Sequence, residues 1–318
     1  MRILAVLLLA LAAHAARADS DALSWLQRIH TATEKLSYTG TFVYRSGDQT
    51  ETSRIIHIVG RNGARERLET MDGQRREIIR SGDEVKCYLP DSMTVKVDKQ
   101  TDHMVFPKLL PENLQDISEH YEVSKGGIER IAGFECQAIV LEPRDKLRYG
   151  RRLWADTNTG MLLKSQTLDE KNEVIEQFAF TQIAIGGKID HSQLKPRFLI
   201  KSRDWQVQNS GAVATSLAAS GWTIKPELPG FRKVTEMKRT QGGSSEVGHV
   251  VYSDGLAAVS VFIEPTKKKT SLPPPGLSRQ GAINIYSRQL EHHRVTVVGE
   301  VPADSVMKLA ESVEYRKP

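Results

Sequence analysis

Apolar residues recur at helical spacing near the start of the chain, and the period then shortens. The helical stripe consists of Ala22, Trp25, Leu26, Ile29, Ala32 and Leu36. Positions three and four residues apart share one face of a helix, so this stripe predicts an amphipathic helix that packs on a core. Ser20 precedes the stripe and is suited to cap its first turn.

From Tyr38 onward, short segments rich in valine, isoleucine, tyrosine and phenylalanine alternate with turn residues such as Asn62-Gly63 and Asp72-Gly73. A break over residues 98–120 contains a short helix around Leu114 and Ile117. Roughly eleven strands in one antiparallel sheet predict a half-open barrel with helices, whose concave apolar face packs on helices or holds a ligand. The predicted strands are 38–45, 54–59, 65–70, 75–80, 85–89, 94–97, 128–131, 135–142, 148–156, 162–168 and 174–185.

A second, smaller domain follows a change in composition. Residues 188–218 are predicted to form a linker, because strand periodicity stops at Gly186 and small polar residues dominate 209–220. Strands are expected around Trp222 and over 231–238, 247–253, 256–263 and 293–300. Lys267 to Lys269 and Pro273 to Pro275 mark an exposed loop. Pro302 opens a helix whose apolar positions are Val306, Leu309, Ala310 and Val313. The predicted division is therefore a large domain, 19–187, and a small α+β domain, 219–318.

The first 18 residues have the features of a secretory signal peptide. Arg2 gives the positive start, residues 3–13 give the apolar run, and Ala16-Arg17-Ala18 gives an A-x-A site before Asp19. This run is shorter than the roughly 20 residues that span a bilayer. We expect cleavage after Ala18 and a soluble protein in the periplasm.

Composition and charge describe an ordinary globular protein. Of 318 residues, 39% are hydrophobic and 26% charged, which suits two domains with real cores. The net charge of +5 falls to +3 when Arg2 and Arg17 are subtracted. This mild imbalance does not indicate nucleic-acid binding.

The two cysteines, Cys87 and Cys136, lie in predicted strands of one exported domain. An oxidising compartment allows one disulfide between them. Two small, buried, reduced side chains fit the sequence equally well.

No pattern of catalytic or metal-binding residues is found. Residues 276–281 resemble a nucleophile elbow only superficially, because the spacing is wrong and a proline run precedes them, so a loop is expected. His292 and His293, as strand neighbours, would point to opposite faces and lack further ligands. No glycine-rich phosphate loop is present. We expect no enzyme activity, no metal and no cofactor.

Basic residues gather in two places. One group surrounds a predicted hairpin, and the other alternates with Glu66, Glu69 and Glu77 along successive strands. The favoured interpretation is solvated sheet faces, and the alternative is contact with phosphorylated lipid or an acidic peptide. The groups are Arg144, Lys146, Arg148, Arg151 and Arg152, and Arg61, Arg65, Arg67, Arg75, Arg76 and Arg80.

Several segments resemble the RseB/MucB family of periplasmic stress regulators. They are YSDGLAAVSVFIEP from Tyr252, VTVVGEVP from Val295, SWLQRIHTA from Ser24, GTFVYR from Gly40, RERLETMDGQRREIIR from Arg65 and LDEKNEVIEQFAFTQI from Leu168. Their number and order carry the resemblance, which covers nearly the whole mature chain. Departures lie in residues 188–220 and in the cysteine pair.

The resemblance implies a large domain similar to the LolA and LppX lipoprotein carriers, and a small domain that supports binding to an anti-sigma factor of the RseA/MucA type. It implies that the protein shields the periplasmic part of that membrane-anchored partner from the site-1 protease. Lipopolysaccharide or another acyl lipid would release it. Association with the inner membrane would then occur only through the partner.

Two sets of site residues are expected. For the partner surface we expect the strands near Tyr252 and Phe262, with adjacent parts of the large domain. Periodicity places the candidates for an acyl-chain site on inner faces: Trp25, Ile29, Phe42, Tyr44, Leu68, Leu89, Trp154 and Phe178. A lipid or lipoprotein carrier is the alternative function, which the second domain disfavours, and a hydrolase is the third.

Overall fold

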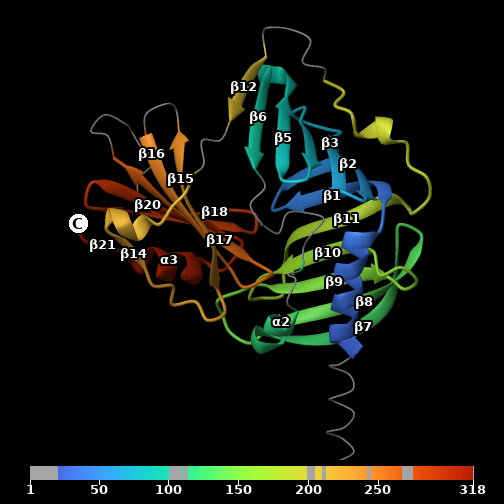
Figure 1. Ribbon diagram of the computed structural model, residues 1–318. Coiled ribbons are helices and arrows are strands. Elements are labelled where there is room, and N and C mark those ends of the chain that lie inside the picture. The colour runs from blue at the N-terminus through green and yellow to red at the C-terminus, as the bar shows by residue number, and fades with distance from the viewer. Residues whose placement is uncertain are drawn as a thin grey trace, which may run out of the picture.

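Twelve strands of the first two thirds of the chain form one sheet in the order β12-β6-β5-β4-β3-β2-β1-β11-β10-β9-β8-β7 (Figure 1). The eleven predicted strands are all present, and each neighbouring pair among them is antiparallel. Their bounds are β1 Tyr38–Ser46, β2 Gln49–Gly60, β3 Gly63–Thr70, β4 Glu77–Ser81, β5 Glu84–Leu89, β6 Thr94–Lys99, β7 Tyr121–Ile131, β8 Phe134–Pro143, β9 Gly150–Asp156, β10 Leu162–Leu168 and β11 Val174–Ile185.

The structure is a computed structural model that describes residues 21–99, 110, 114–198, 205–209, 213–241, 245–266 and 275–317. The predicted signal peptide 1–18 with its cleavage site and the lysine run 267–269 lie outside the described residues. No helix within the described ranges has the length and apolar character needed to cross a membrane.

The large sheet is curved and open. Its ends are β7 and β12 (Gln206–Asn209), and β12 pairs in parallel with β6. The predicted α+β class is confirmed, but the sheet does not close into a barrel. Strand β12 comes from the predicted linker, where a four-residue, fully exposed segment carries no hydrophobic alternation.

The predicted first helix spans residues 21–35 and lies on the concave face across β7, β8, β9 and β10 (Figure 1). Ala22, Trp25, Leu26 and Ile29 pack there against Leu141 and neighbouring strand residues. The short helix expected around Ile117 is α2, Gln115–His120. The helix thus fills part of the concave face and leaves the rest open to the second domain.

The predicted linker is partly attached to the large sheet. Its 3-10 helix η2, His191–Leu194, places Leu194 against Ile56 and Ile58, and Arg67 donates to the Gln193 carbonyl at 3.2 Å. Two further 3-10 helices are η1, Pro90–Ser92, and η3, Leu217–Ser220.

The small domain is a seven-stranded sheet in the order β13-β15-β16-β17-β20-β19-β18, covered on one face by α3, Ala303–Glu311. The predicted residues Val306, Leu309, Ala310 and Val313 are buried in this core. Val313 does not belong to the helix as predicted, because α3 ends at Glu311 and Val313 begins β21. A two-stranded ribbon of β14, Trp222–Ile224, and β21, Val313–Tyr315, completes it. The sheet strands are β13 Val213–Ala214, β15 Arg232–Gln241, β16 Ser245–Ser253, β17 Ala258–Pro265, β18 Gly276–Gln280, β19 Ile283–Leu290 and β20 His293–Gly299.

The prediction of a loop over residues 276–281 is wrong. Residues 276–280 form the edge strand β18, which pairs with β19 through a turn at Gly281 with φ of +58°. All five strand residues are exposed, Leu277 included, so burial imposes no alternation on the sequence. Edge strands of this kind carry little hydrophobic signal.

Both cysteines are free in the structure. Of the two alternatives that the sequence left open, a disulfide or two reduced side chains, the structure has the second. Cys87 lies on β5 and Cys136 on β8, and seven strands separate them in the sheet order (β4, β3, β2, β1, β11, β10 and β9). A disulfide needs Cα atoms within about 7 Å, which this topology prevents.

We expect thiol titration of the denatured, non-reduced protein to give two thiols per chain. In the native protein, half-buried Cys87 should react before buried Cys136, because burial raises the pKa of the Cys136 thiol to about 11. A titre of zero would contradict the strand order.

Candidate binding site

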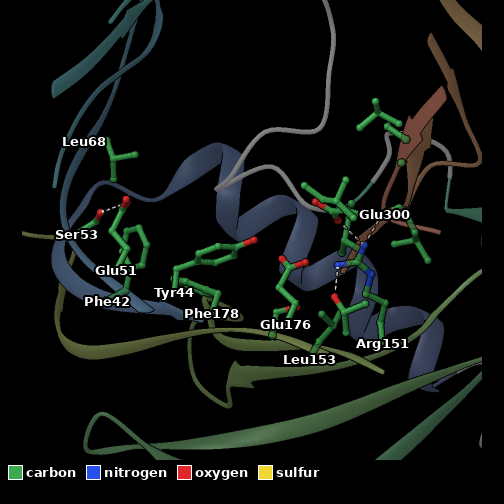
Figure 2. A pocket seen from close by; sticks show the side chains of 18 of the residues that line it. Phe42, Tyr44, Glu51, Ser53, Leu68, Arg151, Leu153, Glu176, Phe178 and Glu300 are labelled. Atoms are coloured by element: carbon green, nitrogen blue, oxygen red, sulfur yellow. Dashed lines mark hydrogen bonds and ion pairs between the residues drawn. The ribbon is translucent and has the colours of Figure 1, made fainter. Parts of the chain in front are cut away.

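A pocket of about 500 Å³ lies between the concave face of the large sheet and the small domain. We call it the interdomain pocket. Figure 2 shows Tyr44 of β1, Glu176 of β11 and Arg151 of β9 along the pocket, with Glu300 of the small domain beside Arg151. The large domain lines it with Phe42, Tyr44, Glu51, Ser53, Leu68, Arg80, Leu110, Arg151, Leu153, Ser165, Thr167, Glu176 and Phe178. The small domain adds Leu256, Ala258, Ser260, Ile283, Val298, Gly299 and Glu300.

Strand register arranges the floor of the pocket in rows. Directly paired residues on neighbouring antiparallel strands point to the same face. Arg151, Thr167 and Glu176 are paired across β9, β10 and β11 and form a polar row. The next row is Leu153, Ser165, Phe178 and Tyr44, and it is mostly apolar. The pocket is therefore amphipathic, with a charged end and an apolar end.

The apolar end is built on aromatic contacts. Phe42 and Phe178 meet edge to face with ring centroids 5.0 Å apart. Leu68 on β3 and Leu153 on β9 extend this surface on either side. Alternation along β1 places Phe42 and Tyr44 on one face of the sheet. This end suits an alkyl or acyl group.

The charged end is organised by Arg151. Its guanidinium donates to Thr167 Oγ1 at 3.0 Å, to the Leu256 carbonyl at 3.2 Å and to Glu300 at 3.3 Å. The last two acceptors belong to the small domain, so Arg151 joins the two domains at the pocket. Its side chain is only 11% exposed, which strengthens these charge-assisted contacts relative to the surface.

Glu176 lies beside Arg151 without an ion pair within 4.0 Å in the described part of the chain. Burial and the negative charge of Glu300 raise the pKa of Glu176 to about 7, although Arg151 and a hydrogen bond from Tyr44 lower it. Burial also raises the pKa of Tyr44 well above its ordinary range. Glu176 therefore changes charge near neutral pH.

The two domains are joined beside the pocket by a fully buried ion pair. Arg148 of the β8–β9 loop lies 2.8 Å from Asp254 of the β16–β17 turn, and both side chains are 0% exposed. Arg148 also donates to the Pro229 carbonyl, and Tyr121 donates to Asp254 at 3.2 Å. Asp254 Oδ1 accepts from two backbone amides of its own turn.

At this boundary each domain also packs one leucine side chain against the core of the other. Leu147 of the large domain packs against the small-domain core, and Leu256 of the small domain packs into the large-domain core. Tyr149 accepts a hydrogen bond from Asn284 at 2.9 Å. These contacts hold the two domains in a defined geometry around the pocket.

Half of the predicted acyl-chain residues line the pocket: Phe42, Tyr44, Leu68 and Phe178. Trp25 and Ile29 lie in the core beneath the first helix instead. Leu89 is half-buried on β5 and is not among the lining residues.

Trp154 also lies away from the pocket. It follows Leu153 on β9 and so points to the other face, where the Lys164 ammonium is 4.0 Å from its ring centroid. The segment 151–155 is buried or half-buried on both faces, so its sequence does not reveal which residues face inward.

The sequence did not identify Glu176, Glu300 or Arg151 as site residues. Arg151 belonged to a basic group interpreted as solvated, and the two glutamates lay unmarked inside family-like segments. The pairing of β9, β10 and β11 brings Arg151 and Glu176 onto one face, and the sequence alone does not show this strand register.

The predicted arginine-rich strands are ion-paired within the large domain. Arg80 contacts Glu66, Arg76 contacts Glu51, and Arg67 contacts Glu77 and Glu69. These pairs neutralise most of the charge that suggested an anion-binding face.

Tyr252 and Phe262 point to opposite faces of the small sheet. Tyr252 is paired with Val259 and is buried in the core beneath α3. Phe262 lies on the face that carries Ala258 and Ser260, and it stacks on His249 with ring centroids 4.3 Å apart. The two residues therefore do not form one continuous patch.

Within the described residues, no cluster of three or more His, Cys, Asp or Glu side chains could hold a metal ion. His293 begins β20 and packs on Trp222, whereas His292 lies in the preceding turn.

Family models match both parts of the chain. The MucB/RseB N-terminal domain matches residues 21–198, and the MucB/RseB C-terminal domain matches residues 216–314. The boundary between the two matches falls within the predicted linker.

Relatives match over nearly the full length. The Pseudomonas aeruginosa sigma factor AlgU regulatory protein MucB is 33% identical, with 98% of each chain covered. The Escherichia coli sigma-E factor regulatory protein RseB is 26% identical, with 91% of this chain and 89% of the relative covered.

A solved structure matches the fold as well. The crystal structure of MucB in complex with MucA(peri) superposes with a TM-score of 0.71 at 30% identity, covering 94% of this chain and 100% of that one. A second MucA/MucB complex, from Pseudomonas aeruginosa, gives a TM-score of 0.72 over the same share of each chain, also at 30% identity.

Proposed function

The chain belongs to the MucB/RseB family, and from this premise we propose that it is a periplasmic regulator that binds the periplasmic domain of an anti-sigma factor of the RseA/MucA type. The bound partner segment is shielded from the site-1 protease, which keeps the envelope-stress sigma factor inhibited. The protein acts by binding and catalyses no reaction. Its large domain works as the half-open barrel that the strand pattern predicted, with the similarity to LolA carriers that the family resemblance implies.

One observation carries this proposal. The alignment covers 100% of a MucB that was solved with MucA(peri), with 30% identity and a TM-score of 0.71. Proteolysis requires an extended, accessible segment, and binding lowers the population of that accessible state by mass action.

The interdomain pocket is the proposed site for the releasing signal, an acyl chain of lipopolysaccharide or another lipid. Its volume lies in the range of small-molecule sites, and its apolar end is lined by Phe42, Phe178, Leu68 and Leu153. The wall formed by Ala258 and Val298 belongs to the small domain. An acyl chain inserted here would press on both domains, and so on any partner surface that both domains form.

We propose that the partner surface includes the Phe262 face of the small sheet and adjacent parts of the large domain. Tyr252 would support this surface from the core, because it is only 4% exposed. A lipid or lipoprotein carrier remains the alternative function. Capture of an acylated lipoprotein, rather than an anti-sigma factor, from envelope extract would favour it.

We expect the chain to bind a purified MucA-type periplasmic domain, and lipopolysaccharide to weaken that binding. Coupling is reciprocal, so the partner should weaken lipopolysaccharide binding by the same factor, about 5–150-fold for typical coupling energies. Titrations of each ligand, with and without the other, measure both factors. If the partner binds and lipopolysaccharide does not change its affinity, the protein shields the partner constitutively and the lipid-sensing part of the proposal fails. If the partner does not bind, the whole proposal is overturned.

A further inference from the structure

The charges that line the interdomain pocket are compensated, except for that of Glu176. Glu51 pairs with Arg76 at 2.9 Å, Arg80 with Glu66 at 2.7 Å, and Arg151 with Glu300 at 3.3 Å. Glu176 has no salt-bridge partner in the described part of the chain, and its Oε2 atom is buried there without a hydrogen bond. The ionised pocket therefore carries one uncompensated negative charge.

The groups that face Glu176 come from four directions. Ser46 and Tyr44 lie on β1, Thr167 on β10, Arg151 on β9, and Glu300 follows β20 of the small domain. Arg151 is engaged by Glu300, so it offers Glu176 only part of its charge. Burial and Glu300 together bring the pKa of Glu176 to about 7, so its charge is set by the surrounding pH.

We propose that Glu176 selects the ligand of the interdomain pocket by charge: ionised, it excludes anionic amphiphiles, and protonated, it admits them and donates a hydrogen bond to their head group. This rests on the proposed function, in which the pocket holds an acyl chain. A negative head group entering beside the ionised carboxylate would meet a like charge in a low-dielectric site. The protonated carboxyl removes that repulsion and gains a donor. The lipid response of this protein would thus be strongest in an acidified periplasm.

A matched pair of probes tests the proposal. Anilinonaphthalene sulfonate (ANS) and N-phenyl-1-naphthylamine (NPN) share one ring system, but only the first carries a negative charge between pH 6 and pH 8.5. Leu68→Asp identifies the site: probe binding that this substitution abolishes is assigned to the interdomain pocket. We expect ANS to bind the wild type about tenfold more weakly at pH 8.5 than at pH 6, while NPN changes less than about twofold.

The decisive variant is Glu176→Gln. The control is Glu173→Gln, which removes the same charge from an exposed residue directly before β11, the strand that carries Glu176. Glu176→Gln should bind ANS at pH 8.5 as tightly as the wild type does at pH 6. Glu173→Gln should keep the wild-type pH dependence. Wild-type ANS binding that does not change with pH, alongside normal NPN binding, would overturn the role of Glu176 and leave the lipid site standing. Loss of both probes would overturn the pocket as a lipid site, and this proposal with it.

Thermal unfolding gives a second measurement that needs no ligand. The folded-state pKa of Glu176 lies above its ordinary value of 4.5, so its protonation stabilises the fold fully below pH 4.5, and this contribution is lost as the pH rises through about 7. Glu176→Gln should therefore melt at a higher temperature than the wild type at pH 8.5 and at a similar temperature at pH 5. An equal difference at both pH values would contradict the titration.

Discussion

Replacing Asp254 with alanine is expected to lower the free energy of unfolding by about 3–5 kcal/mol, because it removes one partner of a fully buried ion pair. Arg148 would keep its contacts to Asp145 and the Pro229 carbonyl, but its charge at the domain boundary would lose the nearest carboxylate. The Tyr121 hydroxyl and the amides of Leu256 and Ala257 would also lose an acceptor. Urea unfolding followed by tryptophan fluorescence measures the change.

The chain offers a matched control at the same boundary. Arg232 and Asp116 also join the two domains, at 3.0 Å, but Arg232 is 71% exposed. Asp116→Ala should therefore cost less than about 1 kcal/mol. Equal losses in the two variants would show that the Arg148–Asp254 pair does not hold the domains together.

Replacing Leu68 with aspartate is expected to weaken binding of a twelve-carbon chain to the interdomain pocket by about 100-fold. Leu68 lines the apolar end, and it is only half-buried, so the variant should still fold. A carboxylate at this position would keep water in the apolar end. Excluding about four methylene groups from burial costs about 3 kcal/mol, which corresponds to that factor. Calorimetric titration with dodecyl maltoside below its micelle concentration measures the affinity without a charged head group.

Leu89→Asp is the control for this experiment. The sequence pattern placed Leu89 in the acyl-chain site together with Leu68, whereas the structure places it on β5 outside the lining residues. Its substitution should leave dodecyl maltoside affinity within about twofold of the wild type, since no group touching the chain changes. If Leu89→Asp weakened binding as much as Leu68→Asp, the acyl chain would lie elsewhere on the sheet.

The strands of the large domain were predictable because most of them have one buried and one half-exposed face. Burial on one side of β11 produces an apolar-polar alternation around Phe178 and Phe180, and turns such as Asn62-Gly63 separate neighbouring strands. The first helix was predictable for the same reason, with a period of 3.6. Strands β12, β13 and β18 were missed, because an exposed edge strand places no constraint on which residues are apolar. Strand β19 was missed as well, because its buried positions, Asn284 and Ser287, are polar.

The site was only partly predictable. Phe42 and Tyr44 follow from alternation along one strand, but Trp154 was assigned to the wrong face because β9 is largely covered on both sides. Tyr252 and Phe262 are close in the family-like segment, yet β16 and β17 turn them to opposite faces.

The sequence by itself determined the family, the first helix, the eleven antiparallel strands of the large domain and the two cores, since these depend on local periodicity and on motifs that are contiguous in the chain. Only the tertiary structure decided the pairing of Arg148 with Asp254, the free state of the cysteines and the row that places Glu176 near Glu300. These depend on strand order and on docking of the domains, which join residues more than 100 positions apart. No local pattern encodes such distances, because each contact is fixed by the packing of the whole fold.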